Sequence, residues 1–323
     1  MAKIALMLLL LSSFVLAEYK ERREALDKFV VDYPFRIFYT TKGKDGVVDS
    51  RDLNKNSIPD YVEDTLIHLK LADYIFSNSL NLTPPLESKK YKKAKYIDVN
   101  LLSLNNKKHL GQAMDAIIKH NRVAGAKDVY TLNIDIRPNL DGRSFTPIHE
   151  LFHLYMNGYT DIKNKWLTEG LARVSQRAFG YGRLSYQGSE PFPVSSSERS
   201  RLYEKSYDAF YFWNELMYRL YGNSTIDDLD KILSVRYVDG RYVLDDFKMY
   251  GYKFLRPFFE ELQKSDILIE SQRGLEGGMW RSSDKFSKEN NPYIWRAIKN
   301  TILKEKKDRI KNDPYIRAIF LID

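Results

Sequence analysis

No cysteine occurs among the 323 residues of the chain. The protein therefore has no disulfide bond and no cysteine at which a bacterial lipoprotein would be acylated. Histidine is also scarce, because the sequence contains only five. Two of them, His149 and His153, belong to a His-Glu-x-x-His motif, which arises by chance in about one such chain in a few hundred. That pair is therefore the most informative feature of the sequence.

Long hydrophobic runs are missing, apart from one near the N-terminus. Ile4–Leu11 is apolar, Lys3 precedes it, and Val15-Leu16-Ala17 ends in the small residues that a signal peptidase reads. The run is too short for a comfortable membrane span, and a charged stretch follows at once. We expect residues 1–17 to be a cleaved signal peptide, so that the mature protein is secreted or periplasmic without stable membrane insertion. An uncleaved anchor is the alternative.

The charge balance does not single out an acidic or nucleic-acid partner. The formal net charge is +8, with 29% charged and 43% hydrophobic residues, the composition of an ordinary globular protein. The basic runs at 89–93 and 304–307 are short, and no nucleic-acid recognition motif accompanies them. We interpret these runs as solvated surface and expect no nucleic-acid partner. The length suffices for one large domain or for two lobes with a core.

The His-Glu-x-x-His motif lies at residues 149–153. Residues four apart lie one above the other on a helix, so His149 and His153 can present two imidazoles to one metal ion. Glu150 lies at the edge of that face, where its carboxylate can reach metal-bound water. The predicted helix has an N-cap residue, a first-turn proline and a terminal glycine: Thr146, Pro147 and Gly158. An amphipathic helix with two chance histidines is the alternative.

A third ligand follows on a second predicted helix, from Trp166 to about Phe179. Glu169 lies sixteen residues beyond His153, which lets the chain turn and bring the second helix against the first. Two imidazoles and one carboxylate leave a fourth position on zinc for water, the pattern of a catalytic rather than a structural site. An exposed helix glutamate is the alternative, but the apolar neighbours of Glu169 argue against it.

The twelve residues from Asp52 to Glu63 follow the ligand order of a calcium-binding loop. Oxygen-bearing side chains occupy positions 1, 3, 5, 9 and 12, and a backbone carbonyl occupies position 7. The expected ligands are Asp52, Asn54, Asn56, Ile58 through its carbonyl, Asp60 and Glu63. Ser57 stands at position 6, where a sharp turn needs positive φ and favours glycine. A polar turn that caps a helix at 60–78 is the alternative.

The hydrophobic patterns predict an α+β protein with two lobes. The N-terminal lobe, residues 18–143, begins with a charged helix at 18–30. Its strands form a small mixed sheet, and they are predicted at residues 35–40, 95–102, 111–117 and 129–136. An exposed edge strand of this sheet can hold an extended peptide by backbone pairing. The lobe of residues 144–323 is mainly helical and catalytic, with the zinc site expected between the two lobes.

The C-terminal half offers fewer chemical signals. We expect a loop at 180–200, then a helix from Tyr203 to Tyr221 that Gly222 ends. On that helix Tyr207 and Tyr211 would share one face. A hairpin is expected at 237–243, and Asn291-Pro292 marks the start of a final helix.

The motif at 149–153, followed by Leu167-Thr168-Glu169-Gly170-Leu171-Ala172, resembles the gluzincin metallopeptidases, the superfamily of thermolysin and aminopeptidase N. With the loop at 52–63 upstream, roughly residues 35–225 are more narrowly similar to a group of secreted bacterial metalloproteases. The resemblance implies a two-lobed gluzincin-like fold with zinc on His149, His153 and Glu169 and with Glu150 as the general base.

Two positions depart from the gluzincin pattern. Arg173 stands where thermolysin-like enzymes carry an acidic residue that supports the first zinc-binding histidine. Ala113-Met114-Asp115 matches the exopeptidase motif Gly-Ala-Met-Glu-Asn only in part, so an aminopeptidase activity stays open. In related peptidases a tyrosine from the region after the second helix donates a hydrogen bond to the developing oxyanion. Tyr207 is the candidate for that role, with packing as the alternative.

The sequence therefore predicts an exported zinc metallopeptidase that acts on a peptide or protein substrate. A zinc-activated water would attack the peptide bond, and Glu150 would transfer the proton to the leaving amine. Zn²⁺ is the expected cofactor, and Ca²⁺ is expected at the upstream loop. One alternative is a non-catalytic exported binding or scaffold protein with a residual zinc site, and another is a zinc hydrolase acting on a non-peptide bond.

Overall fold

The computed structural model describes residues 18–106, 108–122, 129–180, 192–275 and 279–322. The predicted signal peptide and part of the predicted loop at 180–200 lie outside the described residues. The chain divides into two compact units. Unit 1 comprises Met1–Leu69, Tyr91–Glu150 and Tyr237–Arg241, and unit 2 comprises Lys70–Lys90, Leu151–Arg236 and Tyr242–Asp323. Among the described helices, none is long and apolar enough to cross a membrane.

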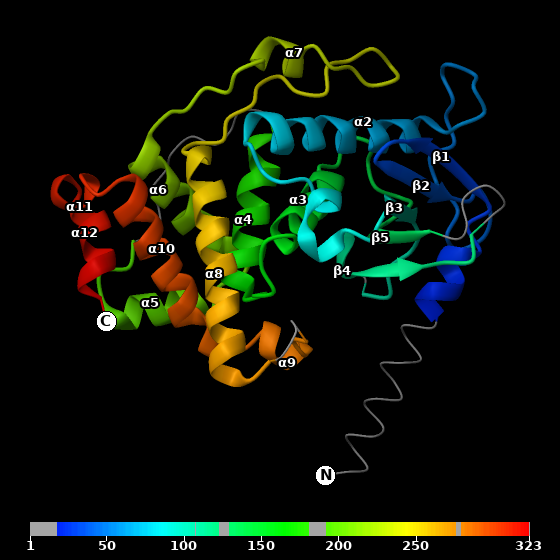
Figure 1. Cartoon of the computed structure of the whole chain (residues 1–323). Coiled ribbons are helices and arrows are strands. Elements are labelled where there is room, and N and C mark those ends of the chain that lie inside the picture. The colour runs from blue at the N-terminus through cyan, green and yellow to red at the C-terminus, as the bar shows by residue number, and fades with distance from the viewer. Residues whose placement is uncertain (1–17, 107, 123–128, 181–191, 276–278, 323) are drawn as a thin grey trace. The chain divides into compact units, whose positions relative to one another are not determined.

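Unit 1 is built on a five-stranded mixed sheet with the strand order β1-β2-β3-β5-β4 (Figure 1). The strands are β1 (Lys28–Asp32), β2 (Phe35–Tyr39), β3 (Tyr96–Leu101), β4 (Gly111–Lys119) and β5 (Tyr130–Ile136). The three central strands β2, β3 and β5 are parallel, whereas β1 and β4 pair antiparallel at the two edges. The predicted α+β class, the mixed sheet and the exposed edge strand are confirmed.

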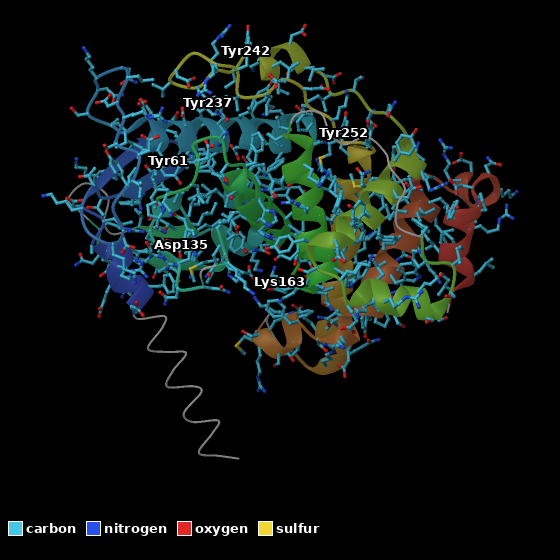
Figure 2. The ribbon with its side chains drawn as sticks, turned by 180° about the vertical axis from the view of Figure 1, so that it is seen from behind. Tyr61, Asp135, Lys163, Tyr237, Tyr242 and Tyr252 are labelled. Carbon is cyan, nitrogen blue, oxygen red and sulfur yellow. The ribbon has the colours of Figure 1, made fainter. Side chains whose placement is uncertain are left out.

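The two faces of this sheet differ, because successive side chains of a strand point to opposite sides. One face is apolar and buried, with Ile37, Ile97, Val99, Leu132 and Ile134. The other face is polar and equally buried. There Arg36 donates to Asp98 at 2.7 and 2.9 Å, and Arg23 donates to Asp135 (labelled in Figure 2) at 2.9 and 2.6 Å. Buried charges need such partners, so Arg23 fastens the helix of residues 18–24 to the sheet.

The helix predicted for residues 18–30 is wrong in its second half. Residues 18–24 are helical, but the chain then forms strand β1 from Lys28. Phe29-Val30-Val31 is aromatic and β-branched, a composition that favours a strand, and it pairs in antiparallel register with β2. Pairing with a neighbouring strand therefore overrides the helical charge pattern.

Three predicted helices are confirmed. They are α2 (Asp60–Tyr74), which continues into a π-helical turn at Ile75–Ser79, α3 (Thr146–Asn157) and α4 (Lys165–Ala178). The division between the units falls inside α2 after Leu69 and inside α3 after Glu150. The elements that carry the predicted metal ligands are therefore those that the sequence indicated.

The single helix predicted from Tyr203 to Tyr221 is wrong. The chain forms α5 (Ser196–Tyr203), a 3₁₀ turn named η4 (Tyr207–Ala209) and α6 (Phe210–Tyr221). The hydroxyl of Ser195 accepts the backbone N–H of Glu198 at 3.3 Å, an N-cap that starts α5 inside the predicted loop. Gly222, at φ +65°, ends α6 as predicted.

The remaining helices of unit 2 are α7 (Leu229–Leu233), α8 (Leu255–Arg273), α9 (Ser282–Lys285), α10 (Asn291–Glu305), α11 (Arg309–Asn312) and α12 (Pro314–Leu321). Figure 1 shows α8 beside α10, against which it packs. The helix predicted from Asn291 is present as α10 but is not the last one. The carboxylate of Asp313 accepts the N–H groups of Tyr315 and Ile316 and so begins α12.

The predicted hairpin at 237–243 is confirmed as a tight turn. The N–H of Tyr237 donates to the carbonyl of Arg241 at 2.9 Å, and Gly240 adopts φ +83°. Arg236 and Tyr242 form an antiparallel bridge at its base. Glycine suits the turn because its φ lies in the left-handed region.

Candidate metal centre

The helix α3 carries the His-Glu-x-x-His motif from a start that differs slightly from the predicted one. Thr146 was predicted to cap the helix but is its first residue. The N–H of Thr146 donates to the hydroxyl of Ser144 at 3.4 Å, and the N–H of His149 donates to the carbonyl of Phe145 at 3.2 Å. At the other end Gly158 donates to the carbonyl of Leu154, so α3 ends where the sequence indicated.

The residues of the motif are largely withdrawn from solvent. His149 is 5% exposed, Glu150 is 6% exposed, and the side chain of His153 is 13% exposed. Both imidazoles lie on one face of α3, because they are separated by four residues. A water-poor setting strengthens electrostatic interactions at these groups.

The helix α4 presents Glu169, and tight packing fixes the backbone at that position. A Cβ placed on the adjacent Gly170 would lie 2.7 Å from the indole of Trp213 and 3.1 Å from the side chain of Ala209. Glycine is therefore needed for α4 to approach α6 this closely. The indole N–H of Trp213 also donates to the carbonyl of Trp166 at 2.6 Å, and the two rings stack 5.2 Å apart. Glu169 thus projects from a rigid part of unit 2.

One group of metal-ligand residues occurs within the described ranges, and it consists of His149, His153 and Glu169. Their ligand atoms all lie within 4.8 Å of one another. His153 Nε2 and Glu169 Oε2 are 3.6 Å apart. Two donors bound tetrahedrally to one zinc ion at standard bond lengths are separated by about 3.4 Å, so the two side chains fit a shared ion. The group can hold a metal ion.

Glu150 lies beside the first ligand and contacts the edge strand β4. A Cβ on Gly111, the first residue of β4, would lie 2.6 and 2.7 Å from the Glu150 side chain and 2.8 Å from that of Thr146. Only glycine leaves room for the carboxylate at this point. The start of the edge strand and the predicted general base are therefore neighbours within unit 1.

The connection between α3 and α4 is held by a buried carboxylate of α8. Asp266 accepts the hydroxyl of Thr160 at 2.8 Å and the backbone N–H of Asp161 at 2.7 Å. Burial raises the pKa of Asp266 to about 7, Asp161 adds to the rise, and the hydrogen bonds and Lys163 oppose it. Asp266 therefore titrates near neutral pH while it holds the connection.

Two further side chains brace the same connection. Asn291 at the start of α10 accepts the side-chain amide of Asn164 at 2.9 Å and the indole N–H of Trp166 at 2.8 Å. Lys163, labelled in Figure 2, donates to the side chain of Asn157 and to the carbonyl of Thr160. Together these contacts fix where α4 begins relative to the end of α3 and hence the spacing of His153 and Glu169.

The predicted calcium loop is an exposed turn closed by its own hydrogen bonds. Asp52 accepts the backbone N–H groups of Asn56 at 3.1 Å and Ser57 at 2.8 Å. Asn56 also donates from its side chain to Glu63 at 2.8 Å. Ser57 adopts φ +69°, the conformation that position 6 of such a loop requires. Ser57 therefore adopts the left-handed conformation at position 6 although it is not glycine.

The remaining ligand candidates of the loop are also engaged locally. Asn54 donates to Glu63 at 3.1 Å, and Asp60 accepts the N–H of Leu53 at 2.9 Å. Ile58 follows the turn and donates its own N–H to Asn56. Within the described residues, the carboxylates of the loop do not form a group whose ligand oxygens all lie within 4.8 Å of one another.

Tyr207 lies on η4, which packs against α4. Its side chain is 52% exposed, and its hydroxyl interacts electrostatically with Arg173, one helical turn beyond Glu169. Tyr211 lies on α6, so the two tyrosines do not share a face of one helix as predicted. Burial lowers the pKa of Arg173, whose guanidinium donates to Gln176.

Sequence reasoning missed Gly111, Asp266 and Asn291. A glycine at the start of a strand is a recognised signal of close backbone approach, so Gly111 could have been identified from the sequence. Asp266 and Asn291 contact partners more than one hundred residues away in the chain, and no local sequence pattern indicates such contacts.

Comparison of the chain with protein-family models, curated proteins and solved structures found no match. The resemblance to gluzincins therefore stays a prediction.

Proposed function

We propose that the chain is a zinc-dependent peptidase whose metal is held by His149, His153 and Glu169. The proposal is carried by the convergence of two imidazoles and one carboxylate from α3 and α4 within 4.8 Å. Three protein ligands of these types leave a coordination position open, which is typical of hydrolytic zinc sites. A bound zinc ion supplies Lewis acidity at that position and lowers the pKa of water.

Glu150 is the proposed general base. It precedes Leu151 on the ligand helix, is buried, and lies outside the ligand group of the described residues. Its carboxylate takes a proton from the water that attacks the peptide carbonyl and passes that proton to the leaving amine. One water is consumed as the C–N bond breaks, and Glu150 ends ionised, as it began.

The open edge of strand β4 supports the proposal that the substrate is a peptide. The carbonyl of Leu110 accepts the N–H of Arg137 on the β5 side, and backbone groups alternate in an antiparallel pair. The N–H and C=O groups of Gly111 and Ala113 therefore point away from β5, toward the open edge. An extended peptide can pair with these groups. Because Gly111 contacts Glu150, a peptide bound there would run past the general base.

The proposal is tested by measuring zinc content and cleavage of a diverse peptide library. We expect one zinc per chain, cleavage that a chelator abolishes, and recovery when zinc is returned. His153→Ala should lose both zinc and cleavage. Stoichiometric zinc without cleavage would instead identify a binding or scaffold protein, and cleavage of esters alone would identify a non-peptide hydrolase.

We also propose that the loop at 52–63 binds Ca²⁺ through Asp52, Asn54, Asn56, the Ile58 carbonyl, Asp60 and Glu63. The positive φ of Ser57 supports this proposal, because it gives the turn that a twelve-residue calcium loop needs. The side chains of Asn54 and Asn56 already converge on Glu63. When a cation binds, the side-chain amides of Asn54 and Asn56 would rotate so that their oxygens, instead of their N–H groups, point toward the centre of the loop.

A further inference from the structure

Three tripeptides of the form Asp-x-Arg are distant in sequence and share one local structure. They are Asp49-Ser50-Arg51, Asp141-Gly142-Arg143 and Asp239-Gly240-Arg241. In each, the arginine N–H donates to Oδ1 of the aspartate two residues earlier, at 3.2, 2.9 and 3.1 Å respectively. All three lie in unit 1 and line one cavity of about 440 Å³.

The cavity is large enough for a small molecule, since binding pockets commonly measure about 300–1,000 Å³. Its wall is mostly charged. Tyr237, from the hairpin, and Asp60 and Asp64, from α2, also line the cavity, and the remaining lining residues are Val48, Leu53, Asn139 and Leu140. Figure 2 shows Tyr237 where the hairpin passes α2, and its hydroxyl lies 2.6 Å from Nε2 of His68 on that helix. A ligand of this cavity must therefore carry charge of its own.

The three arginines are not equivalent. The guanidinium of Arg51 donates to Asp49 at 2.9 Å, and that of Arg241 donates to Asp239 at 2.6 Å. These two charges are neutralised within their own turns. The guanidinium of Arg143 makes no hydrogen bond or ion pair with any residue in the described ranges. Arg143 is therefore the cation of the cavity that is available to an anionic group.

Asp64 is the complementary group. It is half-buried and accepts the N–H of Val238 at 3.1 Å, and no cationic side chain of the described residues forms an ion pair with it. Its carboxylate lies next to Gly142, where an added Cβ would be 3.4 Å from Oδ2. Asp64 therefore reaches the turn that carries Arg143.

We propose that this cavity binds a small zwitterion, an amino acid or short peptide with a free amine and a free carboxylate. The ammonium group is held by Asp64 and the carboxylate by Arg143. A divalent cation fits less well, because the described residues here include no group of three carboxylates with convergent oxygens. The inference is independent of the peptidase proposal, since His149, His153 and Glu169 do not line the cavity, whereas Asp60, a proposed calcium ligand, does.

The test is calorimetric titration of the zinc-loaded full-length protein with L-leucine, N-acetyl-L-leucine and L-leucinamide at pH 7.5. We expect leucine to bind with a Kd of at most a few millimolar. Removing either ligand charge should weaken binding at least about tenfold, because a charged hydrogen bond is lost. Asp64→Asn and Arg143→Gln should each weaken leucine binding to a similar extent.

Two controls distinguish binding in this cavity from binding elsewhere on the protein. Arg51→Gln also removes a guanidinium from the lining of the cavity. Because Arg51 is already paired with Asp49, this change should weaken leucine binding by less than about threefold. His153→Ala should leave leucine binding intact, whereas loss there would place the ligand at the metal centre and overturn the proposal. Undetectable binding, or equal binding of all three probes, would also overturn the proposal.

Discussion

At the scale of single residues, Glu150 joins the proposed chemistry to the packing of the sheet. It stands between the ligands of α3, and its side chain would lie 2.6 Å from a Cβ added to Gly111 of β4. The same carboxylate that would move a proton therefore also packs against the first residue of the edge strand. Larger side chains at Gly111 would displace it.

Glu150→Gln should retain zinc but lower kcat by at least about a hundredfold, because the base is lost while the ligands remain. Turnover of a peptide cleaved by the wild type, together with bound zinc per chain, measures both effects. The control is His153→Ala, which should lose the metal as well. Full activity in Glu150→Gln would rule out the proposed proton transfer.

Asp266 should make stability depend on pH. Its pKa is raised to about 7 in the folded protein, well above the ordinary value of an aspartate. The folded state therefore binds more protons than the unfolded state between about pH 4 and 7, so the contribution of Asp266 to stability falls as pH rises through that window.

Relative to Asp266→Asn, the wild type should lose at most about 1.4 kcal/mol of unfolding free energy per pH unit between pH 4 and 7. Denaturant unfolding of both proteins at several pH values gives this difference. Parallel curves for the two proteins would show that Asp266 does not titrate in that window.

At the scale of elements, peptide binding and stability can be tested separately on the edge strand β4, because its N–H groups alternate between the open edge and β5. The N–H of Ala113 points to the open edge, whereas that of Met114 points to β5. Ala113→Pro should raise KM for peptides about tenfold or more with little change in the unfolding midpoint, because the lost donor faces outward. Met114→Pro is the matched control, which should destabilise the protein by about 3 kcal/mol. Unchanged KM in Ala113→Pro would contradict peptide pairing along β4.

Elements with strong local signals were predictable from sequence. The spacing of His149 and His153, the terminal Gly158 and the alternation in β3 and β5 each specify a local structure, and those elements are present. Residues 25–30 were misjudged because strand pairing with β2 decides their conformation. The N-cap at Ser195 lies inside the predicted loop, so the start of α5 was not predicted. The braces of the metal centre depend on contacts distant in sequence, which no single-chain pattern reveals.

At the scale of the whole molecule, calcium should raise stability without changing the chemistry. Ligand binding to the folded state alone stabilises by about 2.7 kcal/mol at a hundredfold excess over Kd. Thermal unfolding of zinc-loaded protein with and without calcium should show a shift that Asp52→Ala combined with Glu63→Ala removes. An unchanged wild-type midpoint, or an equal shift in the double variant, would reduce the loop to an ordinary turn.

The order in which the chain is synthesised has a consequence for unit 1. Five residues of that unit, Tyr237–Arg241, are made only after most of unit 2. They supply the hydroxyl at the fully buried His68 and the N–H at Asp64. A growing chain that has reached residue 236 therefore still holds unit 1 incomplete, with a buried imidazole lacking its partner. Unit 1 can therefore be completed only after residues 237–241 are made, and neither unit is a continuous segment that can be transferred to another protein.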